Sequence, residues 1–213
     1  MTSAVILISG RGSNLKALVE ARTGLEVRAV ISNRPAAKGL EWAAREGFVT
    51  RVLDHRTFAT REAFDAALAA EIESHRADLV LLAGFMRIFT AAFIERFPRR
   101  ILNIHPSLLP AFPGLHTHRR ALEAGVKVHG ATVHVVTPAL DDGPIVIQGA
   151  VPVLEGDTED SLAERVLEVE QRIYPQAVRW FVEGRVDFGA GPVVRVRGTG
   201  IGRDSLVSPR NVA

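Results

Sequence analysis

Short apolar runs alternate with amphipathic stretches through the first half of the chain. Residues 79–83, Leu-Val-Leu-Leu-Ala, are all apolar, which is typical of a strand buried on both faces of a sheet. Residues 60–75 instead place Phe64, Leu68 and Ile72 four positions apart, which predicts an amphipathic helix. The same reasoning predicts strands over residues 4–9, 27–32, 50–53, 79–83 and 101–104, and helices over 15–21, 39–47, 60–75 and 90–97.

This alternation predicts an α/β fold: a single Rossmann-like domain with a mostly parallel central sheet flanked by helices. The pattern changes near residue 126, because residues 128–136 alternate and 145–153 form another apolar run, which favours a mixed or antiparallel C-terminal section. A long amphipathic helix is predicted over 161–181. Residues 187–213 are rich in glycine and poor in apolar clusters, so we expect a peripheral strand and a loose tail there. The domain itself is predicted to span residues 1–186.

A polar pair, Asn103 and His105, stands at the exit of the strand predicted over 101–104. Side chains of a strand alternate between its faces, so these two point to the same side. Pro106 holds His105 in an extended conformation. An amide donor beside an imidazole suits the stabilisation of an oxyanion. The alternative is a buried asparagine that caps a turn and a histidine that fills the core.

A glycine-rich turn, Gly10-Arg11-Gly12-Ser13-Asn14, joins the first strand to the first helix. Glycines allow close approach of a ligand, and the amides at a helix N-terminus attract phosphate. The turn is neither a Walker A loop nor the dinucleotide fingerprint, because Leu15 occupies the third glycine position of the latter. It therefore favours a phosphomonoester pocket over a simple turn capped by Ser13 or Asn14.

Two further loops carry candidate chemistry. Residues 83–88, Ala-Gly-Phe-Met-Arg-Ile, leave a buried strand through a glycine and could hold a flat heterocycle, although packing of Phe85 and Met86 into the core is the plainer interpretation. Residues 140–144, Leu-Asp-Asp-Gly-Pro, predict a turn. If that turn approaches His105, the carboxylate of Asp141 would favour the charged imidazolium.

Composition narrows the classes of function. The chain has no cysteine, no Gly-x-Ser-x-Gly elbow and no helical metal-ligand spacing among its seven histidines, so we expect neither a thiol or serine nucleophile nor a metal. The pI of about 9.5 comes from 23 arginines, whereas the net charge is only +2 and the basic residues are scattered. Without a basic patch, a signal peptide or an apolar run of about 18 residues, we expect a cytoplasmic protein that binds neither nucleic acid nor membrane.

These segments together resemble the phosphoribosylglycinamide formyltransferases, the folate-dependent enzymes of purine biosynthesis. The resemblance runs from about residue 4 to 186. It rests on residues 8–15 (Ile-Ser-Gly-x-Gly-Ser-Asn-Leu), 83–88, 102–110 (Leu-Asn-Ile-His-Pro-Ser-Leu-Leu-Pro), 113–118 (Pro-Gly-Leu-His-Thr-His), His129-Gly130, Val133-His134 and the 140–144 turn. Two features depart from the family pattern: Asp142 stands where glycine is expected, and residues after 187 match nothing familiar.

The resemblance implies direct attack of the amine of 5-phosphoribosyl-glycinamide on the formyl group of 10-formyltetrahydrofolate, in IMP synthesis, through a tetrahedral intermediate. It also implies a phosphate-binding N-terminal half, a folate-binding C-terminal half, small-molecule substrates, no metal, and a monomer or homodimer. Asn103, His105 and Asp141 would be catalytic, with Asp141 favouring the protonated form of His105. The ribonucleotide would be held by Gly12, Ser13, Asn14, Leu167, Glu168, Val169 and Glu170, and the folate by Arg61, Met86, Arg87, Ile88, Phe89, Asn103, Thr137, Pro138, Ala139, Leu140 and Asp141.

Three alternatives compete with this expectation. Formyltetrahydrofolate deformylases share the scaffold but add an N-terminal regulatory domain, and methionyl-tRNA formyltransferases add a C-terminal domain. We expect neither, since the chain opens directly on its first strand and only about 30 residues follow the predicted domain. A non-catalytic nucleotide- or folate-binding module would keep the glycine loop but would not need Asn103, His105 and Asp141 together.

Overall fold

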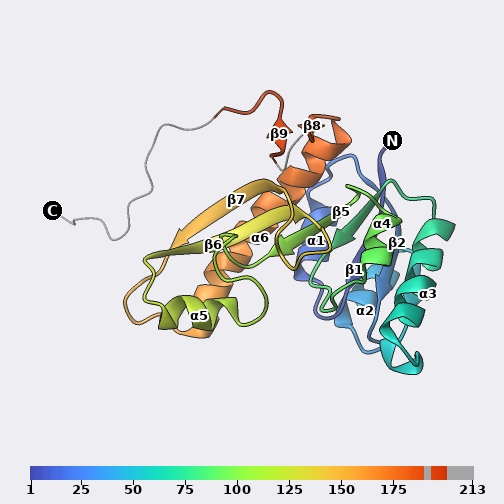
Figure 1. The fold of residues 1–213 in the computed structure, drawn as a ribbon, viewed down its shortest axis with the longest axis horizontal. Coiled ribbons are helices and arrows are strands. Elements are labelled where there is room, and N and C mark those ends of the chain that lie inside the picture. The colour runs from blue at the N-terminus through green and yellow to red at the C-terminus, as the bar shows by residue number, and fades with distance from the viewer. Residues whose placement is uncertain (190–192, 201–213) are drawn as a thin grey trace.

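The structure, a computed structural model, describes residues 1–189 and 193–200. Its core is a seven-stranded sheet in the order β3-β2-β1-β4-β5-β6-β7 (Figure 1). The first five strands in this order are parallel, whereas β6 and β7 are antiparallel to their neighbours. The bounds are β1 Ser3–Ile8, β2 Glu26–Ser32, β3 Thr50–Val52, β4 Leu79–Leu82, β5 Ile101–His105, β6 Val128–Val135 and β7 Ile145–Pro152. The predicted mostly parallel sheet with an antiparallel C-terminal section is therefore confirmed.

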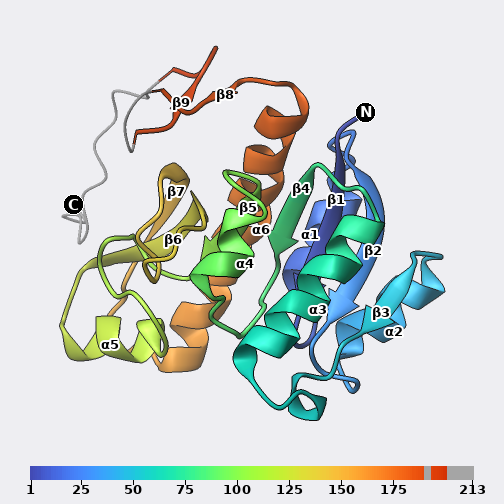
Figure 2. The ribbon, with the colours of Figure 1, turned by 45° about the vertical axis from the view of Figure 1, so that its right-hand side comes forward.

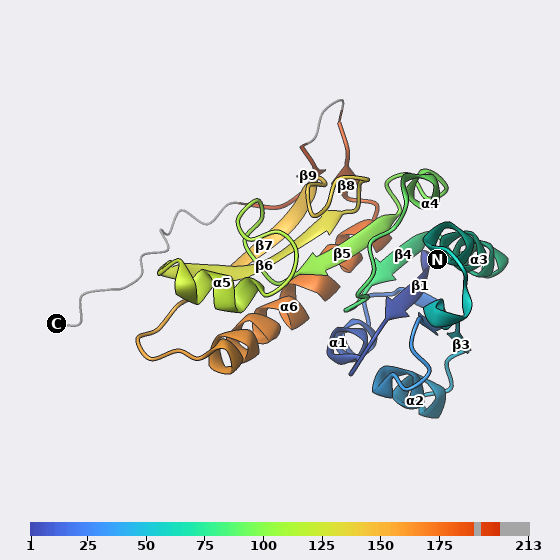
Figure 3. The same cartoon turned by 60° about the horizontal axis from the view of Figure 1, so that its bottom comes forward.

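Helices cover both faces of the sheet (Figure 3). On one face lie α1 (Ser13–Glu20), α2 (Lys38–Arg45) and α6 (Glu159–Val182); on the other lie α3 (Arg61–Ser74) and α4 (Ala91–Glu95). Strand β1 shows why both layers are needed. Its alternate residues Ala4, Ile6 and Ile8 pack toward the first layer, and Val5 and Leu7 pack toward the second, all fully buried.

Helix α6 is the longest helix and ties the two halves of the sheet together. It begins at Glu159, two residues before the predicted start, because Thr158 and Ser161 form a reciprocal capping box. Farther along, the buried Tyr174 hydroxyl donates to the carbonyl oxygens of Leu82 (3.2 Å) and Leu102 (3.0 Å). These bonds fix α6 against β4 and β5, the two strands whose carboxyl ends carry candidate site residues.

The sequence pattern did not predict two short helical segments, α5 (Thr117–Glu123) and the 3-10 turn η1 (His55–Thr57). Both are too short to show helical periodicity. A small hairpin of β8 (Val186–Asp187) and β9 (Arg195–Val196) follows α6 at the periphery (Figure 2). Of the tail predicted over 187–213, residues 190–192 and 201–213 lie outside the described residues, and the division at residue 186 stays a prediction. In the described part of the chain, no helix is both long and apolar enough to cross a membrane.

Candidate active site

The loops that follow β1, β2 and β4 meet at the carboxyl edge of the sheet. Ser9, just beyond β1, donates from its hydroxyl to Asn33 Oδ1 (2.6 Å) and accepts from the Met86 amide (2.9 Å), while its own amide donates to the Gly84 carbonyl (3.1 Å). The strand order reverses between β1 and β4. Ligands of open α/β sheets bind at such a switch point, so the predicted glycine loop and the 83–88 loop lie where a ligand is expected.

The glycine loop has a backbone that only glycine fits. Gly12 has φ +78°, and a Cβ added to it would lie 2.8 Å from the Cα of Gly39. The amide of Gly39 also donates to the Gly10 carbonyl at 3.0 Å, so α2 packs directly against the loop. Helix α1 begins at Ser13 with no side-chain cap at Gly12. Its first-turn amides are therefore available to an anion.

A buried amide–carboxyl pair links the glycine loop to α6. Asn14 Nδ2 donates to Glu170 Oε2 at 2.8 Å, and both side chains are buried. Burial raises the pKa of Glu170 from 4.5 to about 7, although the hydrogen bond from Asn14 opposes the rise. Asn14 Oδ1 has no hydrogen-bond partner among the described residues. A buried carboxyl beside an unused acceptor is the kind of arrangement found at ligand sites.

The neighbouring residues of α6 are placed differently. Val169 is buried against β7, where a Cβ added to Gly149 would lie 2.2 Å from Val169 Cγ1. Leu167 is partly buried, and Glu168 is exposed. Of the four predicted ribonucleotide residues on this helix, the structure thus joins Glu170 to the glycine loop, and the side chain of Val169 belongs to the core.

Asn103 and His105 lie on β5 as predicted and face their partners on β6. The antiparallel register pairs Asn103 with His134 and His105 with Thr132. Asn103 Nδ2 is 3.2 Å from His134 Nε2, and His134 Nδ1 is 3.2 Å from the Val135 carbonyl. A neutral His134 with its proton on Nδ1 satisfies both contacts. Burial lowers the pKa of His134, which agrees with this neutral form.

The third predicted catalytic residue, Asp141, reaches the same place from the loop after β6. Its Oδ2 is 3.5 Å from His105 Nδ1, and its Oδ1 is 3.8 Å from His134 Nε2. The Gly114 amide donates to Asp141 Oδ2 at 2.8 Å. The structure therefore brings together Asn103, His105 and Asp141, which the sequence could only suggest.

The loop over residues 106–116 closes one side of this cluster. His105 Nε2 lies 3.1 Å from the Phe112 carbonyl, so each of its ring nitrogens faces an oxygen acceptor and a protonated ring would donate to both. His129 lies beside the ring of Phe112, with the ring centroids 5.8 Å apart. Burial lowers the pKa of His129 to about 4, with smaller contributions from the charges of His118 and His105. Burial also lowers the pKa of His118. Burial therefore favours the neutral form of both rings.

Sequence reasoning missed His134 and Thr132 as site residues. Thr132 Oγ1 donates to the Ser107 carbonyl (2.7 Å) and accepts from the Leu109 amide (3.0 Å), which holds the loop after His105 in place. The signal was present in the alternation of residues 128–136, which places Thr132 and His134 on one face. Only the β5–β6 register shows that this face adjoins Asn103 and His105.

The predicted folate residues divide into exposed and buried side chains. Met86, Ile88 and Leu140 are 63%, 55% and 51% exposed, so these large apolar side chains are open to contact with a ligand. The expectation that Phe85 packs in the core is therefore confirmed, and the same expectation for Met86 is wrong. Phe89 instead stacks in the core between Phe85 and Phe93. Two of the remaining predicted folate residues are arginines: Arg61 donates to the Phe89 carbonyl, and Arg87 lies over the Phe64 ring. In the loop after β6, Thr137 Oγ1 donates to the Ala139 carbonyl, and Pro138 and Ala139 are exposed.

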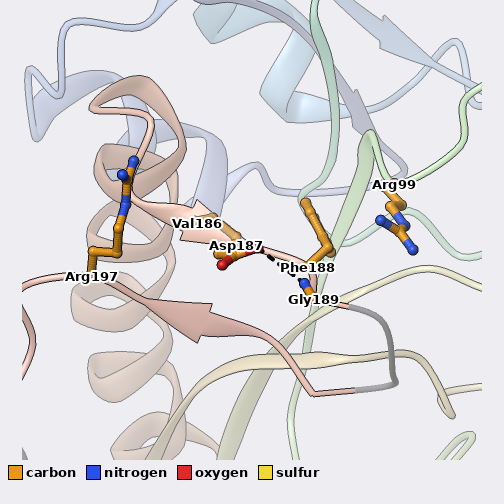
Figure 4. A pocket seen from close by; sticks show the side chains of 6 residues that line it. All are labelled: Arg99, Val186, Asp187, Phe188, Gly189 and Arg197. Carbon is orange, nitrogen blue, oxygen red and sulfur yellow. Dashed lines mark hydrogen bonds between the residues drawn. The ribbon is translucent and has the colours of Figure 1, made fainter.

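An open depression of about 630 Å³ lies elsewhere, next to the β8–β9 hairpin (Figure 4). Arg99 lines it with Val186, Asp187, Phe188, Gly189 and Arg197. Arg99 precedes β5, whereas His105 ends it, so this depression and the candidate active site lie at opposite ends of that strand. Among residues 1–189 and 193–200, no group of three His, Asp or Glu side chains is arranged to hold a metal ion.

Comparison with known proteins identifies the family. The formyl transferase pattern matches residues 2–178, which is most of the chain. The chain belongs to the formyl transferase family. It is 50% identical over 186 residues to phosphoribosylglycinamide formyltransferase of Escherichia coli K12, covering 85% of this chain and 88% of that protein.

Two further relatives extend the comparison. The human trifunctional purine biosynthetic protein adenosine-3 is 45% identical over 188 residues, which cover 86% of this chain and 19% of the human protein. The crystal structure of glycinamide ribonucleotide transformylase 1 from Symbiobacterium toebii superimposes with a TM-score of 0.88 at 52% identity, covering 92% of this chain and 94% of that one. The predicted resemblance is thus confirmed at the level of the family.

Proposed function

We propose that this protein transfers the formyl group of 10-formyltetrahydrofolate to the amine of 5-phosphoribosyl-glycinamide, a step of de novo purine biosynthesis. The observation that carries the proposal is the convergence of Asn103, His105 and Asp141 at the same carboxyl edge of the sheet as a glycine loop suited to phosphate. The relatives named phosphoribosylglycinamide formyltransferase support the choice of acceptor.

In the reaction, the substrate amine attacks the formyl carbon, so a C–N bond forms and the carbonyl oxygen becomes an oxyanion. Asn103 is suited to stabilise that oxyanion, because one of its amide hydrogens is directed to His134 and the second remains for the substrate. A protonated His105 would supply a second donor. The bond from the formyl carbon to the folate nitrogen then breaks, the amine loses a proton and the folate nitrogen gains one.

Asp141 supports this chemistry through charge. Its carboxylate faces the His105 ring, 3.5 Å from Nδ1, and the Gly114 amide holds the carboxylate in that position. No covalent intermediate with the enzyme is required, which agrees with the absence of cysteine from the chain.

The two substrates would occupy the two sides of this cluster. The amides of Ser13 and Asn14 would hold the phosphate, and Glu170 would accept hydrogen bonds from the sugar. Met86, Ile88 and Leu140, with the backbone of residues 137–141, would enclose the folate. We further expect small-molecule substrates only, no metal, a monomer or homodimer, and a place in the cytoplasm.

The test is absorbance-monitored release of tetrahydrofolate from 10-formyltetrahydrofolate, with and without the ribonucleotide. Release that requires the ribonucleotide is the expected result. Release in water alone would indicate a deformylase, and no release under either condition would leave only a binding module.

A further inference from the structure

Arg120 contacts the loop that touches both His105 and Asp141. It lies on α5, and its Nη1 donates to the carbonyl oxygens of Pro113 and Leu115, the latter at 3.4 Å. Its guanidinium also lies over the ring of Phe112, 5.7 Å from the centroid. One side chain thus contacts the loop at three points in four consecutive residues.

The residues between these contact points are those that reach the catalytic groups. The Phe112 carbonyl faces His105 Nε2 at 3.1 Å, and the Gly114 amide donates to Asp141 Oδ2 at 2.8 Å. Gly114 lies between the two residues whose carbonyls accept from Arg120 and has φ +78°, a conformation in which the chain turns sharply. A shift of this short segment would therefore move both hydrogen bonds at once.

Helix α5 provides a fixed base for the contact. Thr117 and Ala121, on either side of Arg120 along the helix, are buried, and α5 packs against α6. Nη1 carries two hydrogens held in the plane of the guanidinium, so it can donate to both carbonyls in a fixed geometry. The core thus holds α5, α5 holds Arg120, and Arg120 holds the loop.

We propose that Arg120 is a positioning residue, which fixes the 112–115 loop so that its backbone orients His105 and Asp141 for formyl transfer. The inference rests on the proposed function for its catalytic consequence, whereas the effect on the loop can be measured without any substrate. Among the described residues, no hydrogen bond or ion pair joins Arg120 directly to Asn103, His105 or Asp141.

The experiment compares Arg120→Met with Arg119→Met in the full chain. Arg119 is the neighbouring residue on the same helix, is exposed, and lies 3.9 Å from Glu123. Hydrogen exchange of the Gly114 amide, followed by NMR in the unliganded protein, should be at least tenfold faster in Arg120→Met and unchanged in Arg119→Met. Equal exchange in Arg120→Met and the wild type, or equal acceleration in both variants, would overturn the proposal.

Steady-state kinetics supply the second readout. Arg120→Met should lower kcat about tenfold and change KM for either substrate by less than about threefold, since the loss is one of orientation. In an Asp141→Asn background the same substitution should cost clearly less, because one of the groups that the loop positions is already impaired. If the effects of the two substitutions on kcat were fully additive, Arg120 would act elsewhere.

Should Arg120→Met fail to fold, Arg120→Lys replaces it. Intermediate exchange of the Gly114 amide is then expected, and exchange at the wild-type rate would contradict the inference. A wild-type protein without ribonucleotide-dependent activity would reject the proposed function but leave the exchange result to decide the role of Arg120 in the loop.

Discussion

The buried carboxyl of Glu170, in the candidate active site, makes the stability of the fold depend on pH. The carboxyl is buried, hydrogen-bonded to Asn14, and has a pKa raised from 4.5 to about 7. In the unfolded chain the group loses its proton near pH 4.5, whereas in the folded protein it keeps the proton until about pH 7. The folded state therefore binds more protons between these values, and the stability of the protein falls as the pH rises through this window.

The size of the effect follows from the pKa. A rise from 4.5 to about 7, at about 1.4 kcal/mol for each pH unit, corresponds to about 3 kcal/mol of lost stability above pH 7. Glu170→Gln removes the titration and keeps an oxygen that can accept from Asn14 Nδ2. We predict that this variant is more stable than the wild type by about 3 kcal/mol at pH 8 and by no more than about 1 kcal/mol at pH 5.

The assay is urea unfolding at pH 5 and pH 8, with the free energy of unfolding extrapolated to water. Glu164→Gln, an exposed position on the same helix, is the matched control and should change stability little at either pH. An equal gain at both pH values, or no gain at pH 8, would refute the reasoning. Natural proteins retain residues that cost stability where function needs them. If Glu170 is retained because it binds the ribonucleotide, Glu170→Gln should also raise the KM for the ribonucleotide.

Three further predictions test two other residues of the site and one ion pair outside it, between Asp157, just before α6, and Arg165 on that helix. Asp141→Asn should lower kcat by a factor of about 100, since the charge facing His105 is lost; a kcat within about twofold of the wild-type value would contradict that role. Gly12→Ala should destabilise the protein by about 2 kcal/mol and raise the KM for the ribonucleotide, because the new Cβ meets Gly39. Gly47→Ala has a similar φ of +82° in open space and should cost only about 1 kcal/mol, so equal losses in thermal unfolding would show that the contact with Gly39 is unimportant. Asp157→Asn should cost about 2 kcal/mol in the same assay, since Arg165 and the Leu154 amide lose a charged acceptor, and a change below about 0.5 kcal/mol would contradict the importance of this pair.

The sequence predicted the sheet because its strands are local apolar runs. Residues 4–9 and 79–83 appear as β1 and β4 within one residue at each end. The 3.6-residue period likewise predicted α3 and α6. Helix α5 was missed because seven residues show too little periodicity, although Arg120 on that helix contacts the loop beside the site.

The site was less accessible to sequence reasoning, because its contacts join distant segments. The two-residue period of a strand placed Asn103 and His105 on the same face of the sheet, which the structure bears out. The approach of Asp141 to His105 depends on the loop after β6, and the contact of His134 with Asn103 depends on antiparallel register. The family resemblance also named Phe89 and Val169 as site positions. It could not show that their side chains lie in the core.

The most direct test of the central claim follows a ¹³C-labelled formyl group from 10-formyltetrahydrofolate by mass spectrometry. The account predicts that the wild type places the label on the amine of the ribonucleotide. His105→Ala should still bind the ribonucleotide in calorimetry but form almost no labelled product. Label recovered only as formate, or labelled product formed by His105→Ala at the wild-type rate, would contradict the assignment of this cluster as a formyl-transfer site.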